Sequence, residues 1–276
     1  MSPVKAKIIL LTDLSDWCQP WTDALSDARM VTEPEEAGSE GVLFNRVSSG
    51  SMQHRPKWTQ WVEAYLQQQE EAGRQVIHGA KVMRLGCDKL VQAEHFRQCL
   101  VATPATAPIN SSQRAFPDRT VLLKPVSGGY GEGIRVLAPG EEIPLSVVHG
   151  KQAMIEQEKI NPVDGCVHRV EWIGDGILYD AATPLTDVTT NYCLRTTGDQ
   201  TDLQTDLPAR RIEEVTRILL RAGMVVGSIE YLLQPDGEAC YFDLNPVSTF
   251  HPRTESLFGV NPYQYFAEWF SKKYAS

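Results

Sequence analysis

Apolar and polar residues alternate over positions 226–246, VGSIEYLLQPDGEACYFDLNP, on both sides of a strong turn signal. Two runs rich in β-branched and aromatic residues flank residues 235–238 (PDGE), which predicts a β-hairpin. With these four residues as the loop, Glu230 and Asp243 face each other across the strand pair. One face of the hairpin is then apolar and belongs against a core; it carries Ile229, Tyr231, Leu233, Cys240, Phe242 and Leu244. The opposite face carries Ser228, Glu230, Asp243 and Asn245.

Two carboxylates on that polar face suggest a cation site. Carboxylates directly opposite each other lie about 5 Å apart and destabilise the strand pair. A divalent cation between Glu230 and Asp243 removes that penalty, and Asn245 adds a third oxygen ligand. Oxygen ligands without His or Cys suit Mg²⁺, which usually also binds phosphate. The alternative is a solvated acidic sheet face, and a three-residue loop would send Glu230 and Asp243 to opposite faces.

The rest of the pattern predicts alternating strands and helices. Apolar runs at 6–13, 41–49 and 74–79 indicate strands, the first of them parallel. Residues 14–40 are short, polar and poorly periodic. Apolar side chains spaced three and four residues apart predict helices at 56–72, 87–100, 208–222 and 262–273.

A glycine-rich segment, residues 119–137, reads as strand, lysine, loop and strand. Its loop contains Gly128, Gly129, Gly131 and Gly133. It is not a Walker A loop, because no GK[ST] follows, and it is not the dinucleotide fingerprint, because a strand comes next. A glycine-rich hairpin can fold over phosphates with its backbone N–H groups, with Lys124 as a point charge. A plain hairpin turn is the alternative. Further strands are predicted at 152–160 and in a hairpin at 166–184, with Arg169 on its polar side.

Composition narrows the function classes. The chain has 276 residues, 42% of them hydrophobic and 22% charged, and a net charge of −9. This acidity disfavours a nucleic-acid or anionic-membrane partner. No apolar run approaches 18 residues, and the N-terminus carries no signal-peptide cleavage pattern. The six cysteines are scattered without a CxxC pair, as expected for reduced thiols in a cytoplasmic protein.

The order of these pieces resembles the ATP-grasp superfamily, and within it the RimK-like carboxylate–amine ligases. The resemblance runs from about residue 41 to about residue 250. It rests on FNRVSS, VIHGAKVMRLGCDKL with TPAT following, VLLKPVSGGYGEG, MIEQEKI, GCVHRV, and GSIEYL with YFDLNP. It implies an α/β (α+β) ATP-grasp fold with a short N-terminal parallel α/β domain (1–85), a linker helix and glycine-loop lid (86–158), and a C-terminal antiparallel-sheet core with the metal site (159–276).

The resemblance also implies roles for individual residues. Lys89 and Lys124 would hold the phosphates of ATP under the loop from Gly128 to Gly133, and the hinge strand at Gln157, Glu158 and Lys159 would read the adenine edge. Arg169 and Asn191 would face the phosphoryl-transfer centre, with Arg195 as a further catalytic residue. Glu230, Asp243 and Asn245 would hold two Mg²⁺ ions, with Mn²⁺ as an alternative. Arg46, His251 and Arg253 are candidates for contact with substrate, and each has the alternative of an ordinary structural residue.

The chain departs from the family pattern at three positions. An acidic ribose contact is replaced by Val167, a basic residue by Thr189, and an arginine of the preceding strand by Thr183. Arg195 is a candidate to compensate for one of them. These changes bear on the acceptor and on nucleotide affinity more than on the fold.

The resemblance implies an ADP-forming ligase that joins a carboxylate, of an amino acid or a peptide-like substrate, to an amine through an acylphosphate. Two alternatives are a small-molecule kinase on the same fold and a nucleotide-binding regulatory protein without turnover. The expected partners are small molecules or peptides, with neither nucleic acid nor membrane, and a homodimer is left open.

Overall fold

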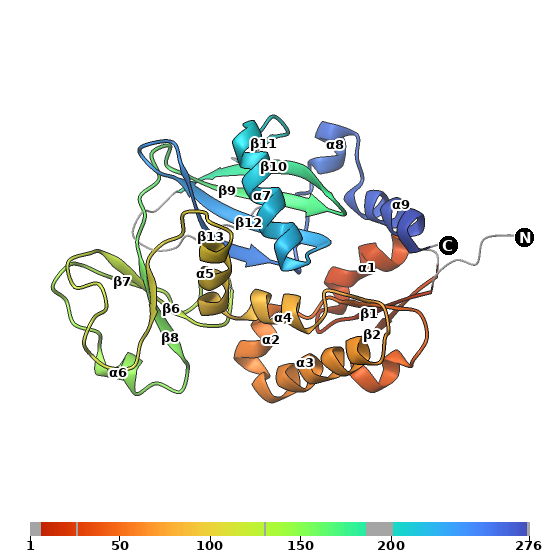
Figure 1. Cartoon of the computed structure of the whole chain (residues 1–276), viewed down its shortest axis with the longest axis horizontal. Helices are drawn as coiled ribbons and strands as arrows, with labels where there is room; N and C mark the ends of the chain where they lie inside the picture. The colour runs from red at the N-terminus through yellow and green to blue at the C-terminus, as the bar shows by residue number, and fades with distance from the viewer. Residues whose placement is uncertain (1–6, 26, 130, 186–200, 275–276) are drawn as a thin grey trace, which may run out of the picture.

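A computed structural model describes residues 7–25, 27–129, 131–185 and 201–274 of the chain. Its strands form three sheets, which we call the N-terminal, lid and core sheets. In Figure 1 the lid sheet lies at the left, the N-terminal sheet at the lower right, and the core sheet above the N-terminal sheet. The mixed α/β class and the predicted combination of a parallel sheet with antiparallel sheets are confirmed. The exact domain boundaries stay a prediction.

The N-terminal sheet is parallel and has the order β2-β1-β3-β4. Its strands are β1 (Ile8–Leu11), β2 (Ala28–Val31), β3 (Val42–Asn45) and β4 (Val76–Ile77). The intervening helices are α1 (Ser15–Ala24), the 3-10 turn η1 (Pro34–Ala37), α2 (Ser49–His54) and α3 (Pro56–Glu71). The prediction missed α1, β2 and η1 within residues 14–40.

Two helices lead from this sheet to the lid. They are α4 (Ala80–Cys87) and α5 (Lys89–Gln98). The Asp88 side chain accepts hydrogen bonds from the N–H groups of Leu90 and Val91, so it caps α5. The sequence pattern did not reveal α4 as a separate helix.

The lid sheet is antiparallel and has the order β5-β8-β6-β7. Its strands are β5 (Thr106–Pro108), β6 (Val121–Pro125), β7 (Arg135–Leu137) and β8 (Met154–Glu158), with the short helix α6 (Leu145–Val148). A buried ion pair between Arg114 and Glu156, with 3.0 Å between Nε and Oε1, joins the loop before β6 to β8.

The core sheet is antiparallel and has the order β11-β10-β9-β12-β13. Its strands are β9 (Cys166–Ile173), β10 (Gly176–Pro184), β11 (Asp202–Gln204), β12 (Val226–Leu233) and β13 (Ala239–Asn245). Three helices complete the fold: α7 (Ala209–Ala222), α8 (Thr254–Phe258) and α9 (Pro262–Tyr274). No helix in the described ranges has the length and apolarity needed to cross a bilayer.

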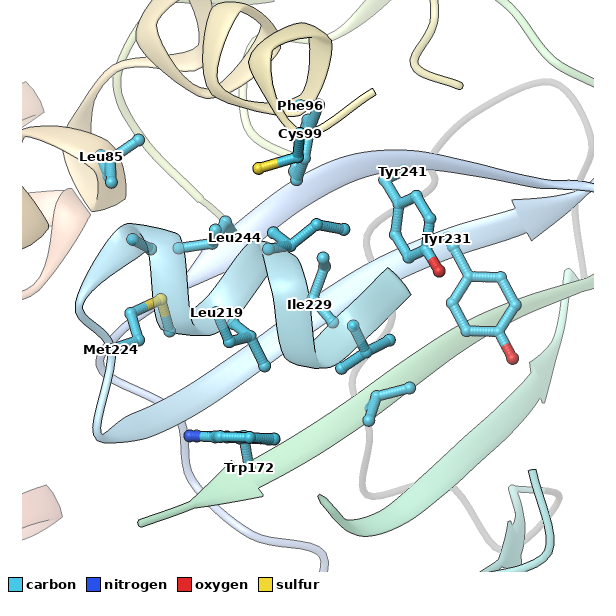
Figure 2. Close-up of a cluster of buried hydrophobic side chains, with 14 of the residues drawn as sticks. Leu85, Phe96, Cys99, Trp172, Leu219, Met224, Ile229, Tyr231, Tyr241 and Leu244 are labelled. Carbon is cyan, nitrogen blue, oxygen red and sulfur yellow. The ribbon is translucent and has the colours of Figure 1, made fainter. Parts of the chain in front are cut away.

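One face of the core sheet is buried under α7 and α5. Figure 2 shows Leu219 of α7 and Phe96 of α5 on the same side as Trp172, Ile229 and Tyr241 of the sheet. A second cluster joins the N-terminal sheet to one end of the core strands β9 and β12; it includes Trp21, Phe44, Ile173, Val226 and Phe266. The opposite face of the core sheet is therefore left to carry the polar groups.

Candidate functional site

The carboxylates of Glu230 and Asp243 are paired across β12 and β13, as the sequence predicts. Ser228 pairs with Asn245 two positions further along the same strands. Both positions lie on the face opposite α7, since the intervening Ile229 and Leu244 belong to the core under that helix. The hairpin therefore presents two carboxylates and a carboxamide on one polar face.

The route to this pairing differs from the prediction. The N–H of Gln234 donates to the Glu238 carbonyl, so the loop is the three residues 235–237, with Gly237 at φ 79° in the left-handed region. The register then shifts by one residue, because Phe242 forms a bulge between the pairs Tyr231–Tyr241 and Glu230–Asp243.

The shorter loop and the bulge together change which side chains meet the core. Tyr241 packs under α7 with Tyr231. Phe242 lies instead with Val167 and Leu232 in a separate apolar cluster, and Cys240 pairs with Leu232. The assignment of Cys240 and Phe242 to the core face is therefore wrong.

The Glu230 carboxylate is destabilised by burial and by the negative charge of Asp243. The side chain is 7% exposed, and burial together with the charge of Asp243 raises the pKa of Glu230 to about 7. Arg169 and Lys124 act in the opposite direction. A cation placed between the two carboxylates would relieve this repulsion, because it favours the ionised form of both.

Arg169 is a buried cation at the centre of the site. Its Nη1 donates to Glu230 Oε1 at 3.0 Å, its Nε to Glu171 Oε1 at 2.7 Å, and its Nη2 to Ser248 Oγ at 2.6 Å. Burial by itself would lower the pKa of Arg169, but the carboxylates of Glu171 and Glu230 outweigh burial and raise it. Arg169 therefore stays charged at the centre of the polar face.

The two lysines predicted to hold phosphates come from α5 and from β6. Lys89 begins α5, and its Nζ donates to the carbonyl of Gly128 at 2.9 Å. Lys124 ends near the core sheet: its Nζ donates to Gln157 Oε1 at 2.8 Å and lies 5.4 Å from the centre of the Phe242 ring. The Lys124 ammonium therefore lies where the lid meets the core, and the Lys89 ammonium lies against the glycine-rich loop.

The glycines of the loop have a physical reason to be glycines. Gly128, Gly131 and Gly133 have φ of 128°, 70° and 74°, values that L side chains rarely adopt. A Cβ on Gly128 would also lie 2.3 Å from Gln53 Oε1 of α2, so the loop backbone passes close to the N-terminal domain. The loop therefore approaches its neighbours with its main chain, which is the property needed for binding phosphate.

Two backbone N–H groups at the hinge strand β8 are already hydrogen-bonded within the lid. The N–H of Glu158 donates to Ala105 and the N–H of Lys159 to Thr120. The Glu158 carboxylate binds Arg119, and the Gln157 amide donates to Thr106. Recognition of an adenine edge by these two N–H groups would require those bonds to break.

Three residues considered for substrate contact have other partners. Arg46 is 1% exposed, and its Nη1 and Nη2 donate to the carbonyls of Pro246 and Ser248. His251 is buried, and its Nδ1 accepts from the N–H of Arg253. Arg253 donates to the carbonyl of Thr201. This arrangement gives Arg46 a structural role, joining the N-terminal sheet to the loop after β13. Asn191 and Arg195, together with Thr189, lie outside the described residues.

The donor set fits a hard cation. Glu230 and Asp243 supply carboxylate oxygens, and Asn245 supplies an amide oxygen that also accepts from the N–H of Val247 at 3.0 Å. The described residues contain no group of three or more His, Cys, Asp or Glu side chains arranged for a metal. The candidate site therefore depends on two carboxylates, and oxygen-only ligands of this kind suit Mg²⁺ bound together with phosphate.

Sequence reasoning overlooked two residues of this face, Glu171 and Ser248. Glu171 is 1% exposed and lies two positions after Arg169 on β9, so period-two alternation could have placed it beside the arginine. Ser248 lies beyond β13, and its Oγ contacts both oxygens of Glu171, at 2.7 and 2.6 Å. No local pattern marks that serine.

No family model and no curated protein matches this sequence. Solved structures do. A RimK-domain ATP-grasp protein from Sphaerobacter thermophilus DSM 20745 has a TM-score of 0.68 at 17% identity and covers 96% of this chain and 99% of its own. D-cycloserine synthetase DcsG has a TM-score of 0.68 at 13% identity over 96% and 99% of the two chains.

A third match is the ATP-grasp ligase PsnB, complexed with a phosphomimetic variant of a minimal precursor, Mg and ADP. It has a TM-score of 0.62 at 13% identity and covers 99% of both chains. Identities this low support a common fold. The chain therefore has the ATP-grasp fold over nearly its whole length, as its motifs indicate.

Proposed function

We propose that this protein is an ATP- and Mg²⁺-dependent ligase that joins a carboxylate to an amine through an acylphosphate. The observation that carries the proposal is the paired Glu230 and Asp243 beside the buried Arg169, with Lys124 reaching this face from the lid. A buried carboxylate paired with a partly buried one, and bordered by cations, is an arrangement suited to a nucleotide bound with a metal.

The residues around this pair define a path for the nucleotide. The purine would lie on the apolar cluster of Val167, Leu232 and Phe242, next to the hinge at residues 157–159. The phosphates would then extend toward Arg169, Glu230 and Asp243, where Lys124 and Lys89 would leave their present lid acceptors to bind phosphate oxygens. The glycine-rich loop, residues 128–133, would cover them.

Glu230, Asp243 and Asn245 would hold the magnesium, which when bound neutralises phosphate charge and orients the phosphoryl group. Arg169 would bind the oxygens of the transferred group, and positioning of this kind supplies most of the catalysis in phosphoryl transfer. The substrate carboxylate would attack the γ-phosphorus, so that the bond from the γ-phosphorus to the β,γ-bridging oxygen breaks and ADP leaves. An amine would then displace phosphate from the acylphosphate. The lid would exclude water, which otherwise hydrolyses that intermediate.

The solved neighbours bear on the substrate class. PsnB is complexed with a precursor, and DcsG is named for a small molecule, D-cycloserine. Both peptides and amino acids therefore belong in a first test. We expect the carboxylate to come from one of these two classes.

The direct test incubates the protein with ATP, Mg²⁺ and pooled amino acids and peptides, with detection of ADP, phosphate and products by mass spectrometry. A ligase gives ADP, phosphate and a product that has lost one water. ADP with a stable phosphorylated product would identify a kinase instead. Nucleotide binding without ADP across the pool would favour a regulatory protein and contradict the proposal.

Asp243→Asn tests the metal site. Asp243 points to the polar face, so the variant should fold normally and lose Mg²⁺-dependent turnover by at least about a hundredfold. Asp175→Asn, at an exposed turn between β9 and β10, is the matched control. Full activity in Asp243→Asn, or unfolding of that variant alone, would remove the metal assignment.

Lys124→Ala tests the phosphate site. Calorimetric titration with Mg²⁺ and ADP should show affinity weakened by about tenfold or more, since a buried cation next to phosphate is lost. Lys151→Ala, on an exposed part of the lid, is the control. Unchanged affinity for ADP in Lys124→Ala would take that lysine out of the site.

A further inference from the structure

A closed ring of hydrogen bonds holds one edge of Arg169. Nε donates to Glu171 Oε1 at 2.7 Å, and Nη2 donates to Ser248 Oγ at 2.6 Å. Ser248 Oγ in turn donates to Glu171, whose Oε2 lies 2.6 Å away. Because Nε and Nη2 belong to one rigid, planar guanidinium, these contacts fix both its position and its plane.

Each member of the ring depends on the others. Glu171 is 1% exposed and Ser248 is 0% exposed. Burial raises the pKa of Glu171, while Arg169 and the Ser248 hydroxyl act to lower it. A buried carboxylate that loses a partner is strongly destabilised. The ring is therefore stable only when all three groups are present.

The ring is anchored to the N-terminal domain. Arg46 Nη2 donates to the Ser248 carbonyl at 2.8 Å, and Arg46 Nη1 donates to the Pro246 carbonyl at 3.0 Å. These bonds fix the loop after β13, which in turn places the Ser248 hydroxyl. The position of Arg169 thus depends on Arg46 and Ser248 as well as on the Glu230–Asp243 pair.

Arg169 has a further partner whose role would change during the reaction. Nη1 donates to Glu230 Oε1 at 3.0 Å, and Glu230 is also a proposed metal ligand. Three of the five N–H groups of Arg169 thus have described acceptors, and the ring accounts for two of these three. When Glu230 turns to a cation, the ring remains while Nη1 is released.

Building on the proposed function, we infer that Glu171 and Ser248 are positioning residues for phosphoryl transfer. They hold the guanidinium of Arg169 in place while its Nη1 edge exchanges Glu230 for the oxygens of the transferred phosphoryl group. Glu171 and Ser248 would contact Arg169 only, and neither would touch substrate.

The test compares Ser248→Ala with Ser228→Ala. Both serines are 0% exposed, and the Ser228 hydroxyl has no hydrogen-bond partner among the described residues, so its removal should be neutral. Ser248→Ala should lower kcat for Mg²⁺-dependent ADP formation by about tenfold or more, with KM for ATP within about twofold. Glu171→Gln, which keeps the shape of the side chain and removes its charge, should act in the same direction and replaces Ser248→Ala if that variant does not fold. A kcat equal to that of Ser228→Ala, or a loss that appears wholly in KM, overturns the inference.

A second readout separates this inference from the proposed function. The Nε–H of Arg169, assigned in ¹⁵N spectra by its loss in Arg169→Lys, should exchange slowly with solvent in the wild type and in Ser228→Ala, and at least about tenfold faster in Ser248→Ala. Equal exchange rates in the two serine variants would refute the ring. If the wild type forms no ADP, the ligase proposal fails, and the exchange rates alone decide whether Ser248 holds Arg169.

Discussion

Acidification should weaken the attachment of the N-terminal sheet to the core sheet through one histidine, His78. Its Nε2 accepts hydrogen bonds from the N–H groups of Val225 and Val226, at 3.1 and 3.2 Å. With Nε2 as acceptor, the neutral ring carries its proton on Nδ1. Protonation of Nε2 would break both bonds and leave a charge in a site that is 2% exposed.

The size of the loss in stability follows from the pKa of His78 in the folded and unfolded states. Burial, aided by the charge of Arg46, lowers the pKa of His78 to about 3 in the folded protein, whereas an unfolded histidine has a pKa of about 6.5. Between these values the unfolded state binds the extra proton, so stability rises with pH. The contribution is therefore complete above about pH 6.5 and is lost as the pH falls toward about 3. At about 1.4 kcal/mol per pH unit, the loss is about 2 kcal/mol at pH 5 and at most about 5 kcal/mol at pH 3.

The assay is urea unfolding of the wild type and His78→Asn at pH 7 and pH 5. Asn tolerates the left-handed backbone at this position, where φ is 59°. The free energy of unfolding should fall by about 2 kcal/mol more in the wild type than in His78→Asn over this interval. His149→Asn, at an exposed position, is the control for the substitution itself. Parallel losses in the wild type and His78→Asn would refute the reasoning.

Two further substitutions test the lid and the helix on the core. Arg114→Ala leaves Glu156 buried without its cation, so the free energy of unfolding in urea should fall by about 3–5 kcal/mol; Arg119→Ala, which removes a half-exposed pair, should change it by less than about 1 kcal/mol, and equal effects would contradict the burial argument. Gly223→Ala should lower stability by about 1 kcal/mol, because Gly223 ends α7 at φ 81°, and an unchanged melting temperature would exclude strain at that cap.

Local sequence signals were sufficient to predict a helix where the residues that determine its bounds lie within or next to that helix. Helix α7 has a continuous apolar stripe and a left-handed glycine after its last residue, so its bounds could be predicted to within a residue or two. The cap of α5 at Asp88 is local in the same sense. In both cases the side chains that determine the structure lie within one or two turns of the residue they affect.

Signals of that kind are missing where the partners are distant. Helix α1 contains Pro20, and its buried residues are Cys18 and Trp21. Two buried positions are too few to show the 3.6-residue apolar period of a helix. What holds it is the contact of Trp21 with Phe44 and Phe266, from segments far along the chain. Ser248 escaped notice for the same reason, since its partner Glu171 lies 77 residues away.

The carboxylate pair shows how a parity argument can reach the right residues through a compensating error. A three-residue loop shifts the hairpin by one position, and that shift alone would send Glu230 and Asp243 to opposite faces. The bulge at Phe242 absorbs one extra residue of β13. It therefore reverses the shift and restores the pairing of Glu230 with Asp243. It also turns Phe242 toward the polar face, where its ring lies 5.4 Å from Lys124 Nζ. Deletion of Phe242 should therefore keep Glu230 opposite Asp243, now in a regular ladder without a bulge, because Asp243 then follows Tyr241 directly. Insertion of one further residue between Tyr241 and Asp243 should disrupt the pair, because the bulge absorbs only one extra residue and a second would turn Asp243 toward the core.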